Sequence, residues 1–114
     1  MRRDHQRLLD ILEALDSVGR MIDGRTEAEF LSDETLHYAV AQRLTVVGEA
    51  VARLSAEIRE RHGSAPWPDI VAFRNILVHE YFGIHWPFVW QTVIDDAPSL
   101  REQIAAIVAI EFPG

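Results

Sequence analysis

The chain has 114 residues, with 18 acidic residues against 11 basic ones, a net charge of −7 and no cysteine. This length fits a single domain over residues 1–114, and the absence of cysteine excludes disulfides and thiolate metal sites. Affinity for duplex DNA comes from neutralising phosphates, so the acidic balance argues against a DNA-binding protein, and any RNA contact must be local or built by oligomerisation. No apolar run reaches the roughly 18 residues that span a bilayer. Residues 1–7 lack the apolar segment of a signal peptide, so a cytoplasmic protein is expected.

Apolar residues at three- and four-residue steps predict an amphipathic helix at the start of the chain, with Gly24 as its stop. The residues on this face are Leu8, Ile11, Leu12, Leu15, Val18 and Ile22. A short helical turn is expected over residues 27–31. Ser32 is predicted to cap the next helix, with Asp33 and Glu34 in its first turn, where the helix dipole favours negative charge.

The second helix is predicted to be long, over residues 33–62, with Gly63 as its cap and Pro66 and Pro68 preventing its continuation. One of its faces is apolar and consists of Val40, Leu44, Val47, Val51, Leu54 and Ile58. A parallel stripe holds only small residues: Ala41, Thr45, Gly48, Ala52 and Ser55. We expect this stripe to admit a second helix at close range, and it is one reason to predict an isologous homodimer.

Two further helices and a final helical segment complete the predicted fold. The third helix is expected over residues 69–82, with Gly83 as its end and Pro87 at the start of the fourth. Pro98 is expected to break or kink that fourth helix, and a last segment uses apolar residues between 100 and 108. No window alternates with period two, so the prediction is an all-α fold: an antiparallel bundle of four to five helices.

The third helix carries the pattern R-x4-H-x-Y, formed by Arg74, His79 and Tyr81. Arginine holds a phosphate with a fixed fork of donors, and histidine can transfer a proton near neutral pH. Together they suit cleavage of an RNA backbone without a metal. On an ideal helix Arg74 and His79 lie about 140° apart. They can act on one phosphate if the long arginine side chain reaches around the helix, or if the two residues come from different subunits. The core-facing residues of this region are then Phe73, Ile76, Leu77 and Ile84.

Each of these residues also has an ordinary interpretation. Arg74 fits a surface ion pair, His79 a surface histidine and Tyr81 a half-buried aromatic, and R-x4-H alone is a weak pattern. Glu49 is interpreted as an ion-pair residue that orients Arg74 or Arg43. The other histidines lack the spacing of a metal triad and are interpreted as surface or capping residues: His37, His62 and His85. The tryptophans are expected in the core or an interface, with base stacking by Trp86 as the lesser alternative: Trp67, Trp86 and Trp90.

The ordered set of short motifs along the chain is more specific than R-x4-H. The set comprises residues 10–14 (DILEA), Phe30 followed by Asp33, 39–44 (AVAQRL), 47–50 (VGEA), 54–55 (LS), 67–70 (WPDI), 74–75 (RN), 79–81 (HEY), and 89–90 (VW) ahead of Leu100. On these motifs the chain resembles the HepT-like branch of the HEPN superfamily over nearly its whole length. That family consists of small all-helical toxins paired with minimal nucleotidyltransferase antitoxins.

The resemblance implies an endoribonuclease toxin of a type VII-like toxin–antitoxin pair. It gives Arg74 and His79 the catalytic roles, with Asn75 as an orienting neighbour, in a homodimer whose two motifs face one cleft. It also implies that the partner nucleotidyltransferase silences the toxin by transferring AMP from ATP to Tyr81. No cofactor and no metal are expected, RNA is the expected substrate and DNA is not. Two alternatives stay open: a non-catalytic HEPN module that binds a nucleotidyltransferase or nucleotide, and a structural helical dimer.

Overall fold

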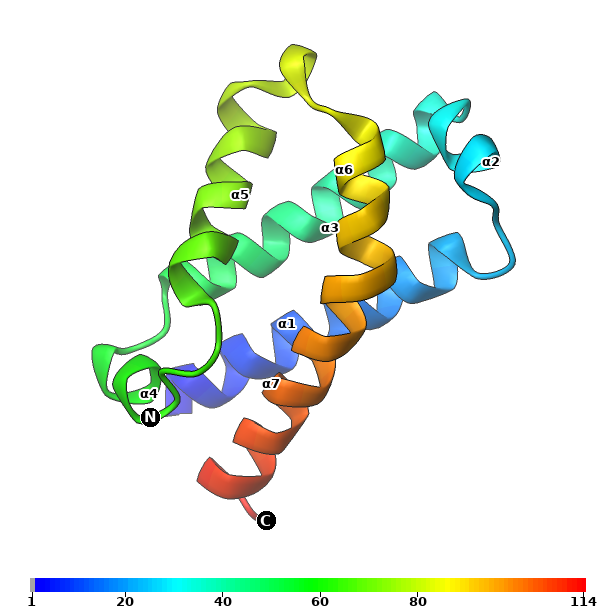
Figure 1. The fold of residues 1–114 in the computed structure, drawn as a ribbon. Helices are drawn as coiled ribbons and strands as arrows, with labels where there is room; N and C mark the ends of the chain where they lie inside the picture. The colour runs from blue at the N-terminus through cyan, green and yellow to red at the C-terminus, as the bar shows by residue number, and fades with distance from the viewer. Residues whose placement is uncertain (1) are drawn as a thin grey trace.

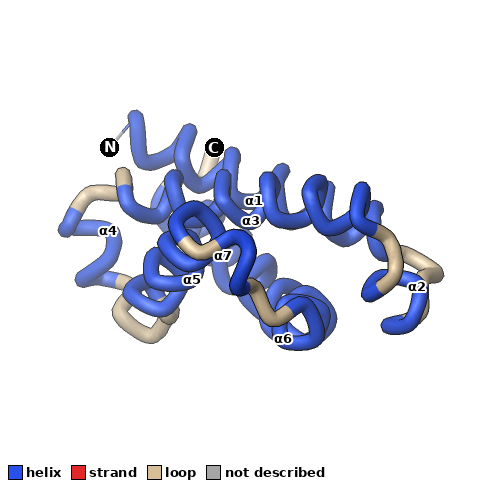
Figure 2. The backbone as a smooth tube through the Cα atoms, turned by 90° about the horizontal axis from the view of Figure 1, so that it is seen from above, coloured by secondary structure: helices blue, strands red, loops and turns tan. Residues whose placement is uncertain are grey.

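A two-layer helical bundle positions every residue of the R-x4-H-x-Y pattern. The computed structural model describes residues 2–114, and within that range the chain forms helices and no strand, so the all-α prediction is confirmed. Figure 1 shows α1 (Arg2–Ile22) and α3 (Glu34–Ala52) running in opposite directions. Figure 2 shows these two helices as one layer, with α5 (Trp67–His79) and α7 (Ala97–Glu111) on the same side of it. α3 packs against both α1 and α5, and α1 also packs against α7.

The first helix buries the apolar face that the sequence predicts. Leu8, Ile11 and Val18 are 0–1% exposed, as period-3.6 burial requires. Gly24, the predicted stop, has a φ of 74°, which is in the left-handed region that glycine adopts without a steric penalty. The chain therefore leaves α1 where the sequence predicts it.

The corner between α1 and α3 is built from two helix caps. The short helix α2 (Glu27–Leu31) lies where it is predicted and begins with a capping box. In this box the Thr26 N–H donates to the Glu29 carboxylate at 2.9 Å, and the Glu29 N–H donates to the Thr26 hydroxyl at 3.2 Å. The prediction of Ser32 as the cap of α3 is wrong: Ser32 ends α2, and the Asp33 carboxylate caps α3.

The predicted long helix over residues 33–62 is broken into two pieces, α3 and α4 (Ala56–Arg61). Asp4, on the first turn of α1 and only 4% exposed, causes the break. Its carboxylate accepts the Ser55 N–H at 2.9 Å and the Ser55 hydroxyl at 2.7 Å. The Ser55 N–H is thus unavailable to a continuing helix, and Ser55 instead caps α4. The apolar pattern alone cannot show this break, because Asp4 is distant in sequence.

The third helix also ends earlier than predicted. It stops at His79 instead of residue 82, and Tyr81–Gly83 form a separate 3-10 turn, η1. In that turn the N–H groups of Gly83 and Ile84 bond to carbonyls three residues earlier. Arg74 and His79 therefore lie on one regular helix, whereas Tyr81 belongs to the turn that follows it.

Pro98 distorts the last helix without ending it. Helix α6 (Trp86–Gln91) passes through a π-helical turn, η2 (Thr92–Asp96), directly into α7, and Figure 1 shows the three as one continuous ribbon. The Ala97 N–H bonds to the Thr92 carbonyl, five residues earlier. Pro98 has no N–H to donate and its ring excludes the carbonyl four residues earlier, so a wider turn keeps the helix intact.

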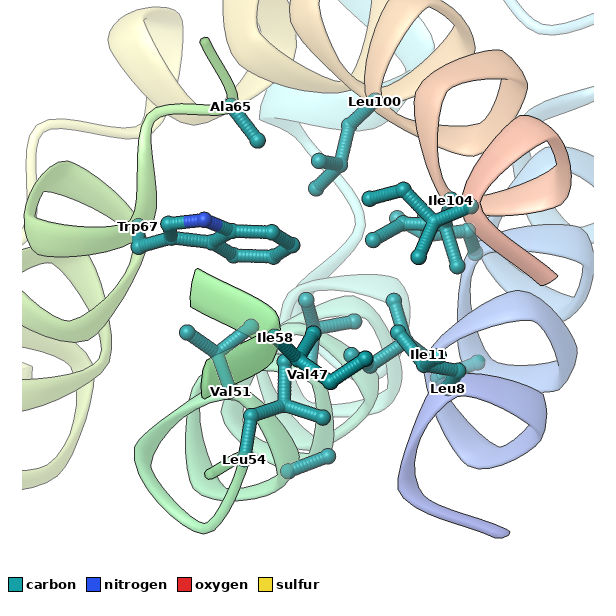
Figure 3. Close-up of a cluster of buried hydrophobic side chains, with 14 of the residues drawn as sticks. Leu8, Ile11, Val47, Val51, Leu54, Ile58, Ala65, Trp67, Leu100 and Ile104 are labelled. Carbon is teal, nitrogen blue, oxygen red and sulfur yellow. The ribbon is translucent and has the colours of Figure 1, made fainter. Parts of the chain in front are cut away.

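Two buried clusters hold the layers together. Figure 3 shows the first, in which Trp67 extends from the start of α5 towards Leu100 and Ile104 of α7. The Trp67 indole N–H donates to the His62 carbonyl at 3.0 Å, so its polar atom is satisfied. The second cluster surrounds Phe30, which is fully buried and contributes about 1.5–3 kcal/mol by its burial. Among the described residues, no helix is both long and apolar enough to cross a membrane.

A carboxylate near the end of α7 makes the stability of the fold depend on pH. Glu111 accepts hydrogen bonds from Arg61 at 2.7 Å and from His62 at 2.8 Å, which ties α7 to α4. The bonds from Arg61, and then from His62, lower the pKa of Glu111 from 4.5 to about 2. Because the folded pKa is lower than the unfolded one, the tie stabilises the fold above pH 4.5 and is lost as the pH falls towards about 2.

We therefore expect Glu111→Gln to lower Tm at about pH 6, and the difference from the wild type to shrink progressively below about pH 4.5. Thermal unfolding followed by circular dichroism over this range measures it. Glu13→Gln, on the exposed side of α1, is the matched control. A Tm difference that stays constant down to about pH 2.5 would contradict this origin of the stability.

Candidate functional site

Three consecutive residues of α5 face three different neighbours. Arg74 reaches Glu49 on α3, Asn75 borders a shallow depression beside α4, and Ile76 borders a groove beside α6 and α7. His79 is exposed on the last turn of the same helix. The site is thus centred on one rigid helix, and each motif residue has its own surroundings.

Arg74 is fixed against α3 by both packing and charge. A Cβ placed on Gly48 would lie 2.2 Å from Arg74 Cβ and 2.7 Å from its Cγ, so only glycine allows the two helices to come this close. Arg74 Nη1 lies 3.2 Å from Glu49 Oε1, and the arginine side chain is 20% exposed. Of the two partners considered for Glu49, Arg74 is the one it contacts. Arg74 Nε is buried and has no hydrogen-bond partner among the described residues.

The stripe of small residues on α3 thus serves the fold of one chain. Gly48 faces α5 of the same molecule, and Ala41 is buried in the cluster around Phe30. A close helix approach at Gly48 is confirmed, and it is made by α5 of the same chain, so this position of the stripe no longer argues for a dimer.

Replacing Gly48 by alanine is expected to destabilise the protein by about 1–3 kcal/mol, because the new methyl group overlaps the root of the Arg74 side chain. Urea unfolding measures the loss. Gly19→Ala on α1 is the matched control, since a Cβ there meets nothing within 4 Å and removing a helical glycine stabilises by roughly 0.5–1 kcal/mol. Equal stability of Gly48→Ala and the wild type would contradict the close approach.

Arg74 and His79 have different surroundings within one chain. Both are in α5, where five residues of α-helix turn the second about 140° from the first. The guanidinium of Arg74 extends to the α3 side, whereas the His79 imidazole lies on exposed surface. Of the two arrangements left open by the sequence, this geometry favours a cleft shared between subunits over a single long arginine reaching its own histidine.

Tyr81 belongs to an aromatic group at the end of α5. Its ring stacks on Tyr38 of α3 at a centroid distance of 5.3 Å and an interplanar angle of 9°. The edges of Phe82 and Trp86 also meet it. Burial, and then the neighbouring Tyr38, raise the pKa of the Tyr81 hydroxyl above its usual value, so it remains protonated at neutral pH. The contact with Tyr38 was not predicted, since no spacing in the sequence links the two tyrosines.

The other histidines have structural surroundings. His37 was predicted at the surface or at a cap, but it is buried: its Nε2–H donates to the Phe30 carbonyl at 2.7 Å, and its ring stacks on Trp86 at 4.1 Å. Trp86 is half-buried and packs against the cluster around Phe30, and His37 covers one face of its ring, which argues against a role in base stacking. His62 ends α4 and His85 precedes α6, as their interpretation as capping residues requires. Among residues 2–114, no group of three or more His, Asp or Glu side chains is arranged to hold a metal ion.

An apolar groove of about 560 Å³ lies between α5 and the continuous α6–α7 helix. Leu44 and Val47 of α3 contribute to its lining, together with Phe73, Ile76 and Phe88. Ile76 was predicted in the core, yet it is 46% exposed, and Phe88 is 57% exposed. The reason is that α7 packs on α1 and α6 on α2, which leaves the side of α5 that carries Ile76 uncovered.

The fold and the site together define a class: a small helical bundle that displays an R-x4-H motif on one helix, with its arginine fixed and its histidine exposed. Comparison with known families is more specific. The family model described as "Ribonuclease HepT-like" matches residues 11–107, so the chain belongs to the HepT-like ribonuclease family and the predicted HepT-like HEPN membership is confirmed.

Similar proteins agree with this membership. The chain is 32% identical over 111 residues to "Putative RNase TTE0752" of Caldanaerobacter subterraneus subsp. tengcongensis, covering 97% of this chain and 99% of that protein. It is 33% identical over 100 residues to "Putative RNase MJ1380" of Methanocaldococcus jannaschii, covering 88% and 92%. It is 32% identical over 102 residues to "Probable ribonuclease HepT" of Thermococcus cleftensis, covering 89% and 93%. No solved structure matches the chain at a significant level.

Proposed function

We propose that the chain is a metal-independent endoribonuclease toxin that cleaves RNA with Arg74 and His79. The observation that carries this proposal is their placement on one helix of a HepT-like ribonuclease domain, with Arg74 fixed to α3 and His79 open to solvent. Arginine and histidine are the two groups that a phosphate-cleaving site needs when no metal supplies charge. Asn75 lies beside Arg74 on the exposed side of α5 and is the supporting residue.

The reaction begins with attack of a ribose 2′-OH on the adjacent phosphate. His79 accepts the proton of that hydroxyl, and Arg74 stabilises the charge that develops on the phosphate oxygens. The 5′-oxygen leaves with a proton, which the His79 of a second subunit supplies. The products are a 2′,3′-cyclic phosphate and a 5′-OH. DNA is not a substrate, because it lacks the attacking hydroxyl.

A homodimer supplies the second histidine in this scheme. Its support is twofold: Arg74 and His79 have different surroundings within one chain, and the apolar groove beside α5 has no partner there. Ile76 lies in that groove one helical turn before His79, so a second subunit seated on it would stand beside the histidine. We expect both copies of α5 to lie near a two-fold axis.

The dimer is tested by placing a charge in the groove. We expect light scattering to give twice the chain mass for the wild type at micromolar concentration, and the mass of a monomer for Phe88→Asp, because a buried unpaired carboxylate opposes association. Ile110→Asp on α7 is the control, since Ile110 is 67% exposed and does not line the groove. A monomeric wild type, or a dimer unaffected by Phe88→Asp, would contradict this interface.

We further propose that a minimal nucleotidyltransferase acts as the antitoxin by transferring AMP from ATP to Tyr81. The Tyr81 oxygen attacks the α-phosphorus, pyrophosphate leaves and the phenolic proton passes to a base. Burial raises the pKa of the Tyr81 hydroxyl, which is protonated at neutral pH, and we propose that a base of the partner enzyme accepts its proton. Tyr81 follows His79 by two residues in the chain, so we expect the attached group to lie close to the proton-transfer residue.

Purified protein and a single-stranded RNA of mixed sequence test the nuclease. We expect cleavage in the presence of EDTA, fragments that end in 2′,3′-cyclic phosphate, and no cleavage of a DNA of the same sequence. Binding of RNA or nucleotidyltransferase without any cleavage would favour the alternative, a non-catalytic HEPN module. Cleavage that EDTA abolishes would point to a metal-dependent reaction instead.

A further inference from the structure

Glu49 contacts the arginine of the motif from a neighbouring helix. Its Oε1 lies 3.2 Å from Arg74 Nη1, and its side chain is 43% exposed. An ion pair with one partner this exposed contributes little to stability, because solvent screens the attraction. Holding the two helices together is therefore a small part of what this contact does; its larger effect is on the orientation of Arg74.

The packing around Arg74 leaves few degrees of freedom to the side chain. Gly48 lets α3 lie against its Cβ and Cγ, and Nε is buried. This packing restricts the stem, and the Glu49 carboxylate lies against one end of the planar guanidinium. Because the guanidinium is a rigid fork, holding Nη1 sets the direction of the Nη2 edge as well.

We infer that Glu49 is the positioning residue of the site: its carboxylate holds Arg74 Nη1 so that the Nη2 edge is oriented for the phosphate of the RNA. This inference rests on the proposed role of Arg74. An arginine ordered before the substrate arrives loses less rotamer entropy in the transition state than a free one. Glu49 does not itself touch the reacting atoms.

The negative charge of Glu49 has a second, opposite effect. A carboxylate next to the phosphate-binding group repels the RNA backbone, and the chain already carries a net charge of −7. Removing the charge should therefore tighten RNA binding, which lowers KM. It should also leave the Arg74 guanidinium free to rotate, which lowers kcat. Loss of a residue that only stabilises the fold would not lower kcat and KM together in this way.

Steady-state kinetics on Glu49→Gln and Glu49→Asp test the inference. We expect Glu49→Gln to lower kcat by about 10- to 100-fold, the loss that misplacement of a catalytic group by about 1 Å produces, with KM equal to or below that of the wild type. Its Tm should stay within a few degrees of the wild type. Glu49→Asp keeps the carboxylate and should recover part of kcat. Glu13→Gln removes the same charge from exposed surface of α1 and should change neither constant.

A second measurement does not depend on activity. The side-chain ¹⁵N–¹H resonances of Arg74, assigned by their loss in Arg74→Lys, should show slow rotation of the guanidinium in the wild type and fast rotation in Glu49→Gln. Unchanged rotation in Glu49→Gln overturns the inference whether or not the protein cuts RNA. A wild-type kcat in Glu49→Gln, with Arg74→Lys inactive, overturns it and leaves the nuclease standing. No cleavage by the wild type overturns the proposed function, and with it the role of Glu49 in catalysis.

Discussion

Replacing His79 by alanine is expected to abolish RNA cleavage and growth arrest while the fold survives. Proton transfer by a positioned side chain typically contributes 10²- to 10⁴-fold to a rate, so cleavage should fall by at least about 100-fold. His79 is exposed on the last turn of α5, so its truncation removes no core contact. Circular dichroism and Tm should therefore match the wild type, and gel-based cleavage of a labelled RNA measures the loss.

The same result is expected for Arg74, where the choice of variant matters. Arg74→Lys keeps the positive charge near Glu49 but replaces a planar fork by a point charge, so it tests phosphate geometry and not merely charge. We expect a loss of about 10²- to 10³-fold, as for removal of one transition-state donor. His85→Ala and Arg20→Ala change an exposed histidine and an exposed arginine elsewhere and are the controls. Wild-type cleavage by His79→Ala would refute the mechanism.

Much of the fold follows from the sequence because its apolar pattern is regular. The buried face of α1, the extent of α2 and the helical character of the motif segment are all visible as three- and four-residue steps. Gly48 is informative in the same way, because a glycine in a stripe of small residues predicts that another helix lies close. These features depend on residues that are close together in the sequence, so the sequence pattern is enough to predict them.

The features that the sequence does not show depend on contacts between distant residues. The break between α3 and α4 requires Asp4 of α1 to meet Ser55, which is 51 residues away in the chain. Burial of His37 requires the Phe30 carbonyl and the Trp86 ring to meet it. The surroundings of the site follow the same rule in part: the sequence leaves Glu49 between Arg74 and Arg43, and only the packing of α5 on α3 selects Arg74. The end of α5 before Tyr81 likewise accompanies ring contacts with Tyr38 and Trp86, which no spacing in the chain encodes.

The second large effect is expected at Tyr81. Co-expression with the partner nucleotidyltransferase should add about 329 Da, the mass of an adenylyl group, or multiples of it, and remove the nuclease activity through added bulk and negative charge. Tyr81 stacks on Tyr38 immediately beyond the end of α5, so the attached phosphate would lie near His79 and repel the backbone of an incoming RNA. Tyr81→Phe should remain toxic but escape silencing, because phenylalanine preserves the ring packing and lacks the acceptor oxygen.

The chain offers its own control for this experiment, since it contains only two tyrosines and they lie against each other. Tyr38→Phe removes the neighbouring hydroxyl and should still carry the adduct and still be silenced. Intact mass and peptide mapping of the wild type, Tyr38→Phe and Tyr81→Phe locate the group. No adduct in the wild type, or an adduct that persists in Tyr81→Phe, would refute silencing through Tyr81. Neither result would contradict the proposed nuclease activity, because Arg74 and His79 are proposed to act on RNA whether or not a nucleotidyltransferase is present.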